Sequence, residues 1–248
     1  MPQSEFGELK VWEDFLAPDN DVTWGTGQFV VGNVAVTSVN EGSVEFTVDE
    51  PGGIAAFTSD TADNDNVAIY AGAFKAADGP LVMEARFKYS NVDCAIFAGF
   101  TETLAIDTPV MPAEFATTTM TYNGTGAIVG AQYDVDGTTD DFRAVFGDAA
   151  AALTGNGADS NGTRANATLT ADRWFIVRAE IDPNGAARVY FGDQVDAAQM
   201  KLVKSVTGGI PTDVMLFPVL MLENRSGNAR VLEVDYFYAR GYRDWAAA

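Results

Sequence analysis

The sequence predicts an all-β domain, because three observations along its 248 residues agree. Apolar segments rich in Val, Ile, Phe and Tyr alternate with clusters of Gly, Asn, Asp and Pro, as expected of strands joined by turns. The segment Leu81–Tyr89 alternates between apolar and polar residues, which is typical of a strand with one buried face. No window shows a sustained helical period beyond a turn or two. We therefore expect an antiparallel β structure.

The expected strands follow one another in chain order, separated by turn residues. They are Phe29–Val39, Ser43–Val48, Ile54–Thr58, Val67–Phe74, Leu81–Tyr89, Ala95–Thr101, Ala127–Val135, Phe142–Phe146, Trp174–Ile181, Ala186–Phe191, Met215–Glu223 and Val231–Arg240. The clearest pair is a hairpin around Asp182-Pro183-Asn184-Gly185, because proline fixes φ early in a turn and glycine accepts a positive φ late in it.

Three other segments interrupt this strand pattern. Leu104–Ala116 contains two prolines, which predicts a long excursion with a single helical turn at Pro112–Ala116. Gly147–Asp172 is rich in Ala, Gly, Asn and Thr, which favours loop. Asp193–Val203 is the best helix candidate in the chain.

The chain is expected to form one domain over residues 26–248, since we find neither an internal repeat nor a linker. Residues 1–25 are expected to form an N-terminal arm whose anchors are Trp12, Phe15 and Trp24. Two interpretations of the arm stay open. It is either an edge strand with a packing tail on its own domain or an extension that clasps a neighbouring subunit, with these three residues at the interface.

Charge limits the partners of the protein. The chain has 15 Lys and Arg against 35 Asp and Glu, a net charge of −20. Nucleic acid and anionic membrane surfaces repel such a chain, so we expect neither as a partner. The charge indicates either a soluble protein kept apart by self-repulsion or an acidic face for cations or a basic partner.

Missing residue types limit the chemistry. Histidine is absent, which removes the commonest general base and every histidine metal site. The single cysteine, Cys94, lies in an apolar run and is expected to be buried and inert. We see no secretion signal and no apolar stretch of transmembrane length, so the expected place of synthesis is the cytoplasm.

The last 75 or so residues, judged by the spacing of their strands, carry a resemblance to a known family. Trp174 leads one strand, Gly192 ends the next, Pro218 lies in an apolar strand, and the closing strand contains Val234-Asp235-Tyr236-Phe237. This pattern resembles the concanavalin A-like lectin/glucanase superfamily, and the likeness extends over residues 40–240. The resemblance implies a jelly roll of two antiparallel sheets. Members of the family include lectins, glycan-binding modules, glycoside hydrolases and modules of phage and viral particles.

The hydrolases of that family place their carboxylates as Glu-x-Asp-x-x-Glu, because retaining hydrolysis needs two carboxyl groups about 5 Å apart. Glu180-Ile181-Asp182 is followed by Gly185 where the second glutamate should be, and Glu233-Val234-Asp235 is followed by Tyr238. The motif begins twice and is completed neither time. We therefore expect no enzymatic activity, and we interpret Asp182 as a turn residue.

Candidate binding residues fall into two sets. Asp134, Asp136, Asp140 and Asp141 surround a glycine and offer oxygens to calcium, the one cofactor we consider, although no glutamate closes an EF-hand and solvated turn residues are the alternative. A second acidic loop covers 60–65. Sugar binding needs aromatic platforms beside polar groups, and the candidates are Trp24, Tyr122, Tyr133 and Trp245, each with a core or interface role as the alternative.

Three functions stay open at this point. The first is a structural protein of a virus particle, a bacteriophage capsid decoration protein on the capsid surface that binds the shell protein and itself as a homotrimer or dimer. The second is a carbohydrate-binding, lectin-like module whose partners are glycans. The third is a glycoside hydrolase with an unusual site.

Overall fold

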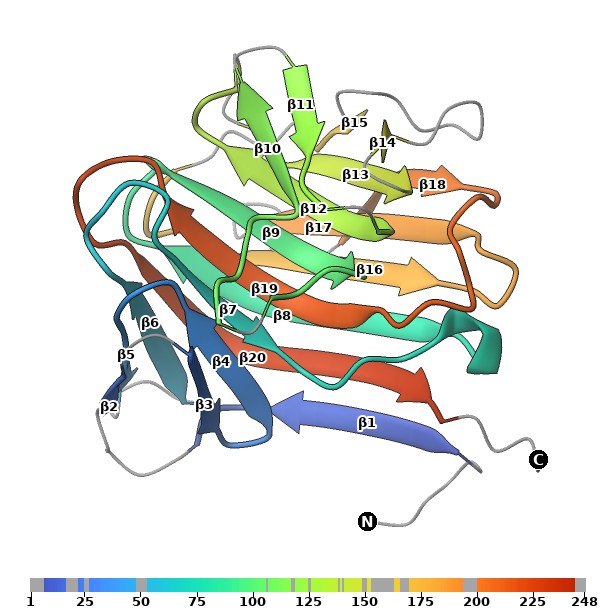
Figure 1. The fold of residues 1–248 in the computed structure, drawn as a ribbon, viewed down its shortest axis with the longest axis horizontal. Coiled ribbons are helices and arrows are strands. Elements are labelled where there is room, and N and C mark those ends of the chain that lie inside the picture. Colours follow the sequence, from blue (N-terminus) through green and yellow to red (C-terminus); the bar gives the residue numbers. More distant parts are fainter. Residues whose placement is uncertain are drawn as a thin grey trace.

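Two antiparallel sheets packed face to face form the body of the protein (Figure 1). The computed structural model describes residues 7–16, 22–24, 27–47, 53–105, 107–116, 119–124, 126–137, 139, 141–148, 151–152, 163–165, 170–193 and 200–243. The chain alternates between the sheets from β6 to β9, so neighbours in a sheet are distant in sequence. This confirms the predicted all-β jelly-roll sandwich.

Sheet A is one of the two layers. From edge to edge it contains β18 (Lys201–Val206), β17 (Ala187–Asp193), β16 (Phe175–Ile181), β8 (Leu81–Tyr89), β20 (Val231–Tyr242), β6 (Ile54–Ser59), β5 (Gly42–Thr47) and β2 (Val22–Trp24), and β1 (Glu8–Glu13) also pairs with β20.

Sheet B is the other layer. From edge to edge it contains β14 (Ala151–Ala152), β13 (Arg143–Asp148), β12 (Ile128–Asp134), β9 (Cys94–Thr101), β19 (Phe217–Asn224), β7 (Asn66–Tyr70), β4 (Val34–Ser38) and β3 (Gly27–Val31), and β15 (Thr163–Arg164) also pairs with β13.

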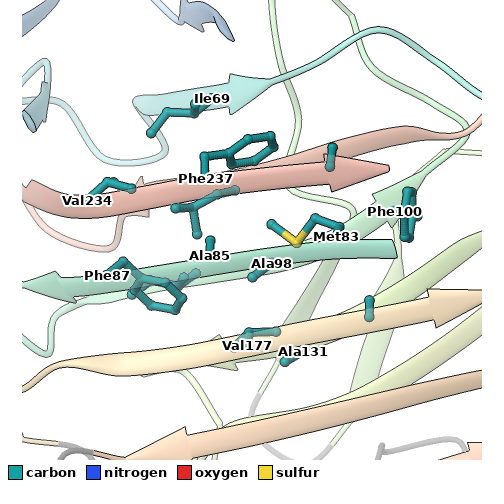
Figure 2. Close-up of a cluster of buried hydrophobic side chains, with 14 of the residues drawn as sticks. Ile69, Met83, Ala85, Phe87, Ala98, Phe100, Ala131, Val177, Val234 and Phe237 are labelled. Carbon is teal, nitrogen blue, oxygen red and sulfur yellow. The ribbon is translucent and has the colours of Figure 1, made fainter. Parts of the chain in front are cut away.

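The main core lies between the sheets, as Figure 2 shows for its central part. Alternate residues of β8, among them Met83 and Phe87, point inward and meet Phe100 of β9 and Phe237 of β20. These side chains are fully buried. Because burying a large apolar side chain contributes roughly 1.5–3 kcal/mol, this layer supplies most of the folding free energy.

A second apolar cluster covers the outer face of sheet B. The hairpin of β10 (Ala113–Ala116) and β11 (Thr119–Tyr122) lies beside this sheet (Figure 1), and we call this hairpin, together with the preceding residues 109–112, the lobe. Met111, Phe115 and Met120 of this segment pack with Phe97 and Met221 of the sheet. Every residue of β9 is therefore buried, which explains why its sequence is continuously apolar rather than alternating.

The N-terminal segment returns to its own sheet. In β1, Trp12 pairs with Tyr238 of β20. The Phe15 ring is 1% exposed and meets the Phe57 ring edge-on at 5.6 Å between centroids. Phe15 therefore belongs to the core of its own chain, which corrects its predicted role at an interface. The backbone of Trp24 pairs with Gly42, and its side chain lies outside the described residues.

Three local predictions differ from the structure. Pro112–Ala116 was expected to contain a helical turn, but Ala113–Ala116 is strand β10. Residues 201–203, at the end of the helix candidate, belong to strand β18, and 194–199 lie outside the described residues. In the described part, the only helical segment is a 3-10 turn at Ala76–Asp78, and no helix there could cross a membrane.

Candidate functional site

Two polar regions are candidates for function. The first surrounds Arg225, which follows β19 at one end of the sandwich. Its guanidinium is 6% exposed and donates to both carboxylate oxygens of Asp134, at 3.1 and 2.9 Å. It also donates to Asn64 Oδ1 at 2.9 Å and lies 2.7 Å from Glu223 Oε1. Arg225 thereby joins the two acidic loops that the sequence analysis singled out.

Both oxygens of the Asp134 carboxylate accept hydrogen bonds. Besides Arg225, its carboxylate accepts the backbone N–H of Phe115 at 2.8 Å and of Asp136 at 3.1 Å. The bond from Phe115 ties the lobe to sheet B. These bonds leave Asp134 as a structural anchor, because its oxygens already have partners.

Glu223 lies beside this ion pair on the outer face of sheet B. It is 2% exposed, and Asn66 Nδ2 donates to its Oε2 at 3.3 Å. Burial raises the pKa of Glu223 to about 7, although the charge of Arg225 lowers it. Asn66 also donates to the backbone carbonyl of Pro109 at 2.7 Å, so the lobe closes over this group as well.

The structure describes three of the four predicted calcium residues, and their surroundings differ. Asp134 is bound by Arg225, and Asp141 forms an ion pair with Arg164. Asp136 is 58% exposed in its side chain, and Asp140 lies outside the described residues. Among the residues that the structure describes, no three acidic or cysteine side chains form a group that could hold a metal. Arginines distant in sequence therefore hold two of the four carboxylates, and calcium binding stays a prediction.

The second region is the outer face of sheet A. Strand register places one row of side chains across four adjacent strands and β1. The row contains Trp12, Tyr238, Glu84, Arg178 and Tyr190. Aromatic rings therefore lie at both ends of the row and an ion pair lies at its centre.

Arg178 holds the centre of this row. Its Nη1 is 3.1 Å from Glu84 Oε2, and its Nε donates to Glu180 Oε1 at 2.7 Å. Burial lowers the pKa of Arg178, but its hydrogen bonds to the two glutamates outweigh that effect and raise it. The Tyr236 hydroxyl donates to Glu84 Oε1 at 2.7 Å. Burial first, and then this hydrogen bond, raise the pKa of Tyr236.

Trp12 is the exposed aromatic residue of this face. Its ring stacks on Tyr236 at 5.2 Å between centroids with an interplanar angle of 11°, and lies 5.6 Å from the Tyr238 ring. The residue is nevertheless 51% exposed. Two tyrosines thus support one side of the indole while the rest of it meets solvent.

The aromatic candidates named from the sequence occupy other places. Tyr133 is fully buried, and its hydroxyl donates to the backbone carbonyl of Val92 at 2.7 Å, so it offers no face to a sugar. Tyr122 is half-buried at the end of β11 and packs against the lobe cluster. Trp245 lies outside the described residues. Trp174, the residue before β16, is half-buried and has the Arg86 guanidinium 4.5 Å above its ring.

Each carboxylate of the two incomplete hydrolase motifs has a partner. Asp182 accepts the backbone N–H groups of Asn184 and Ala186 at 2.8 and 2.9 Å, which confirms its predicted turn role. Glu233 lies 2.9 Å from Lys88, and Asp235 lies 2.5 Å from Arg86. These bonds hold the carboxylates in ion pairs and turns. Cys94 is buried as predicted, and burial raises the pKa of its thiol.

Charge is distributed unevenly over the molecule. The strands of sheet A contain eight cationic and eight anionic residues, so their charges cancel, whereas the whole chain carries −20. The cations are Lys10, Arg86, Lys88, Arg178, Arg188, Lys201, Lys204 and Arg240. The anions are Glu8, Glu13, Glu45, Glu84, Glu180, Asp193, Glu233 and Asp235. The excess negative charge of the protein therefore lies outside this sheet.

The fold has known counterparts among solved structures. A protein of unknown function from Shewanella oneidensis MR-1 superposes with a TM-score of 0.64 at 12% identity, over 98% of this chain and 90% of that one. The carbohydrate recognition domain of Emp47p gives 0.52 at 11%, over 89% and 94%, and peanut lectin gives 0.51 at 14%, over 89% and 97%.

These likenesses show the class of fold, a concanavalin A-like jelly-roll sandwich, as the sequence resemblance implied. At such identities they show the fold alone. No protein-family model matches the sequence, and no curated protein matches it.

Proposed function

We propose that this protein is a non-enzymatic, lectin-like carbohydrate-binding domain, and that the row from Trp12 to Tyr190 on the outer face of sheet A is its glycan platform. The observation that carries the proposal is the exposed Trp12 indole, which two tyrosines hold in place beside the Glu84–Arg178 ion pair.

The chemistry of the row suits a sugar. The carbon-bound hydrogens of a pyranose ring pack on the face of an aromatic ring, and its hydroxyl groups need charged or hydroxylic partners at the edge. Trp12 supplies the first kind of contact, and Glu84, Arg178 and Tyr190 supply the second. Because the ion pairs already fix these side chains, little conformational entropy is lost on binding.

On the other face of the sandwich, the part that the lobe covers is less suited to a sugar. The lobe covers sheet B with Met111, Phe115 and Met120, and Asp134 and Glu223 beneath it are engaged by Arg225. Sheet A, whose charges cancel, also repels an acidic glycan less than the remainder of the protein does.

A glycan array followed by calorimetry tests this proposal. We expect the wild-type protein to bind a subset of saccharides and Trp12→Ala to weaken binding at least about tenfold, which corresponds to losing one aromatic contact. The matched control is Val30→Ala, since Val30 is 63% exposed on β3 of sheet B. The proposal fails if the folded Trp12→Ala variant binds as the wild type does, or if no saccharide binds.

The role in a bacteriophage capsid, the homotrimer or dimer and the capsid-surface location stay predictions. Their support is the strongly acidic charge of the chain. The segment Glu8–Glu13 pairs with β20 of its own chain, which favours the edge-strand interpretation of the N-terminal arm over the clasp. Co-sedimentation with assembled capsid shells measures this function separately from sugar binding, and shells that never retain the protein would contradict it.

A further inference from the structure

An apolar pocket opens at the edge of the sandwich, and the proposed glycan row does not use it. It has a volume of about 370 Å³ and is lined chiefly by Leu9, Phe74, Met215 and Tyr242. The segment that contains Phe74 is fixed to the chain before β19, because Phe74 and Leu216 exchange backbone hydrogen bonds of 3.0 and 2.8 Å. The volume is within the range of small-molecule sites, about 300–1,000 Å³.

Two glycines allow aromatic rings to form the walls. A Cβ placed on Gly241 would lie 2.3 Å from the Phe74 ring, and one on Gly79 would lie 2.4 Å from the Tyr242 ring. Any larger residue at either position would displace its ring. Phe74 is 4% exposed, so its ring is held firmly, whereas Met215 is 47% exposed and adaptable. The walls thus present one fixed aromatic surface and one flexible flank.

The charged residues that line the pocket are mostly cationic. They are Lys75 and Arg243, with one carboxylate, Asp78, in a chain whose net charge is −20. Ten of the 15 cationic residues form ion pairs with acidic residues that the structure describes. Within that same part of the chain, neither Lys75 nor Arg243 does so. An apolar pocket with two uncommitted cations suits a ligand that is apolar in its body and anionic at one end.

We propose that this pocket binds a small aromatic anion, a flat body of one or two rings that carries a carboxylate. The rings would pack between Phe74, Tyr242 and Met215, and the carboxylate would meet Arg243 and Lys75. A saccharide suits this pocket poorly, because its hydroxyl groups would lose their hydration against carbon-lined walls. The ligand class therefore differs from that of the proposed glycan row.

The probe is 2-naphthoate, titrated into ¹⁵N-labelled full-length protein and followed by amide chemical shifts. We expect saturable shifts at residues 72–75 and 241–243, and binding about tenfold weaker for the neutral amide of the same shape, because it lacks the charge-assisted contact. Arg243→Glu should weaken naphthoate binding by a similar factor.

A matched pair of glycine substitutions tests the location. Gly72 lines the pocket, and a Cβ there meets no atom within 4 Å; the same holds for Gly227, which follows β19 in another loop. Gly72→Trp should abolish naphthoate binding and Gly227→Trp should leave it unchanged, with both proteins folded. Equal binding by the two variants, equal affinity for acid and amide, or no wild-type shifts at millimolar naphthoate would overturn the proposal.

Discussion

Replacing Arg225 with methionine is expected to destabilise the protein strongly, because the Arg225 side chain is only 6% exposed and forms an ion pair with a buried carboxylate. Methionine keeps much of the aliphatic length but removes the donors that now reach Asp134, Glu223 and Asn64. The Asp134 side chain is 0% exposed, so it would be left as a buried charge without its counter-ion. Breaking a buried pair in this way costs about 3–5 kcal/mol.

Urea denaturation at neutral pH measures this free energy, and calorimetry should show a fall in Tm of roughly 6–20 °C, at about 2–4 °C per kcal/mol for a chain of this size. The control is Arg188→Met, since the Arg188 side chain is 53% exposed and lies 3.7 Å from Glu180. An exposed pair contributes about 0–1 kcal/mol, so this variant should be close to wild type.

A double-mutant cycle shows whether the effect belongs to the pair. If Asp134→Asn is added to Arg225→Met, the double variant should lose about 2 kcal/mol less than the sum of the single variants, because residues in one ion pair are coupled. Two results would refute the reasoning that this guanidinium compensates a buried charge. One is strict additivity of the two substitutions, and the other is a fall of less than about 1 kcal/mol in the free energy of unfolding for Arg225→Met.

Three further predictions concern other parts of the fold. Burial raises the pKa of Glu223 to about 7, so the folded state favours the protonated carboxyl and stability is lost as pH rises from about 4.5 to about 7. The free energy of unfolding of the wild type should therefore be on the order of 3 kcal/mol lower at pH 8 than at pH 4.5 in urea denaturation. Glu223→Gln should remove this pH dependence. Gly130→Ala would place a Cβ 2.5 Å from the backbone oxygen of Ala98. This overpacking should lower the free energy of unfolding, measured in urea, by at least about 1–3 kcal/mol. A variant as stable as the wild type would show that β12 can shift. Phe15→Ala should lower the free energy of unfolding by about 3–5 kcal/mol, because it leaves a cavity beside Phe57. The molecular mass in light scattering should stay unchanged, and a change of oligomeric state would instead support an interface role.

Much of the fold could be predicted from local pattern. Leu81–Tyr89 alternates because one face is buried, and the structure begins and ends strand β8 at those residues. The turn Asp182–Gly185 could also be predicted from its residues. In the structure Gly185 has a φ of +75°, and the Asp182 carboxylate accepts backbone N–H groups across the turn.

The lobe could not be predicted in the same way. Its hairpin strands are four residues each, and the two prolines nearby suggested an irregular excursion. Its apolar residues pack on a face of sheet B that a two-layer sandwich would leave in water, so alternation in the underlying strands was absent. Short strands that are stabilised by packing on distant residues leave little signal in their own sequence.

The candidate sites were predicted least well, because their geometry depends on register between distant strands. Asp134 and Arg225 are 91 residues apart, and nothing near Asp134 reveals that an arginine will occupy its carboxylate. Trp12 was named for an interface without reference to sugar, and the tyrosines that support it are more than 200 positions away. Tyr133 was an error of the opposite kind, since every residue of β12 is buried whichever face of the strand it occupies.

Because the lobe packs on sheet B, the two sheets differ in how well they tolerate amino-acid substitutions. A strand that is buried on both faces accepts a polar residue only where that residue finds hydrogen-bond partners, and it rarely accepts a bulkier one, so β9 and its neighbours leave little room for substitution. In the part of the chain that the structure describes, the second apolar cluster lies on sheet B and not on the outer face of sheet A, so the outward residues of sheet A tolerate exchange more readily. Descendants of this chain could therefore acquire new partners through sheet A while the hidden layer stayed the same.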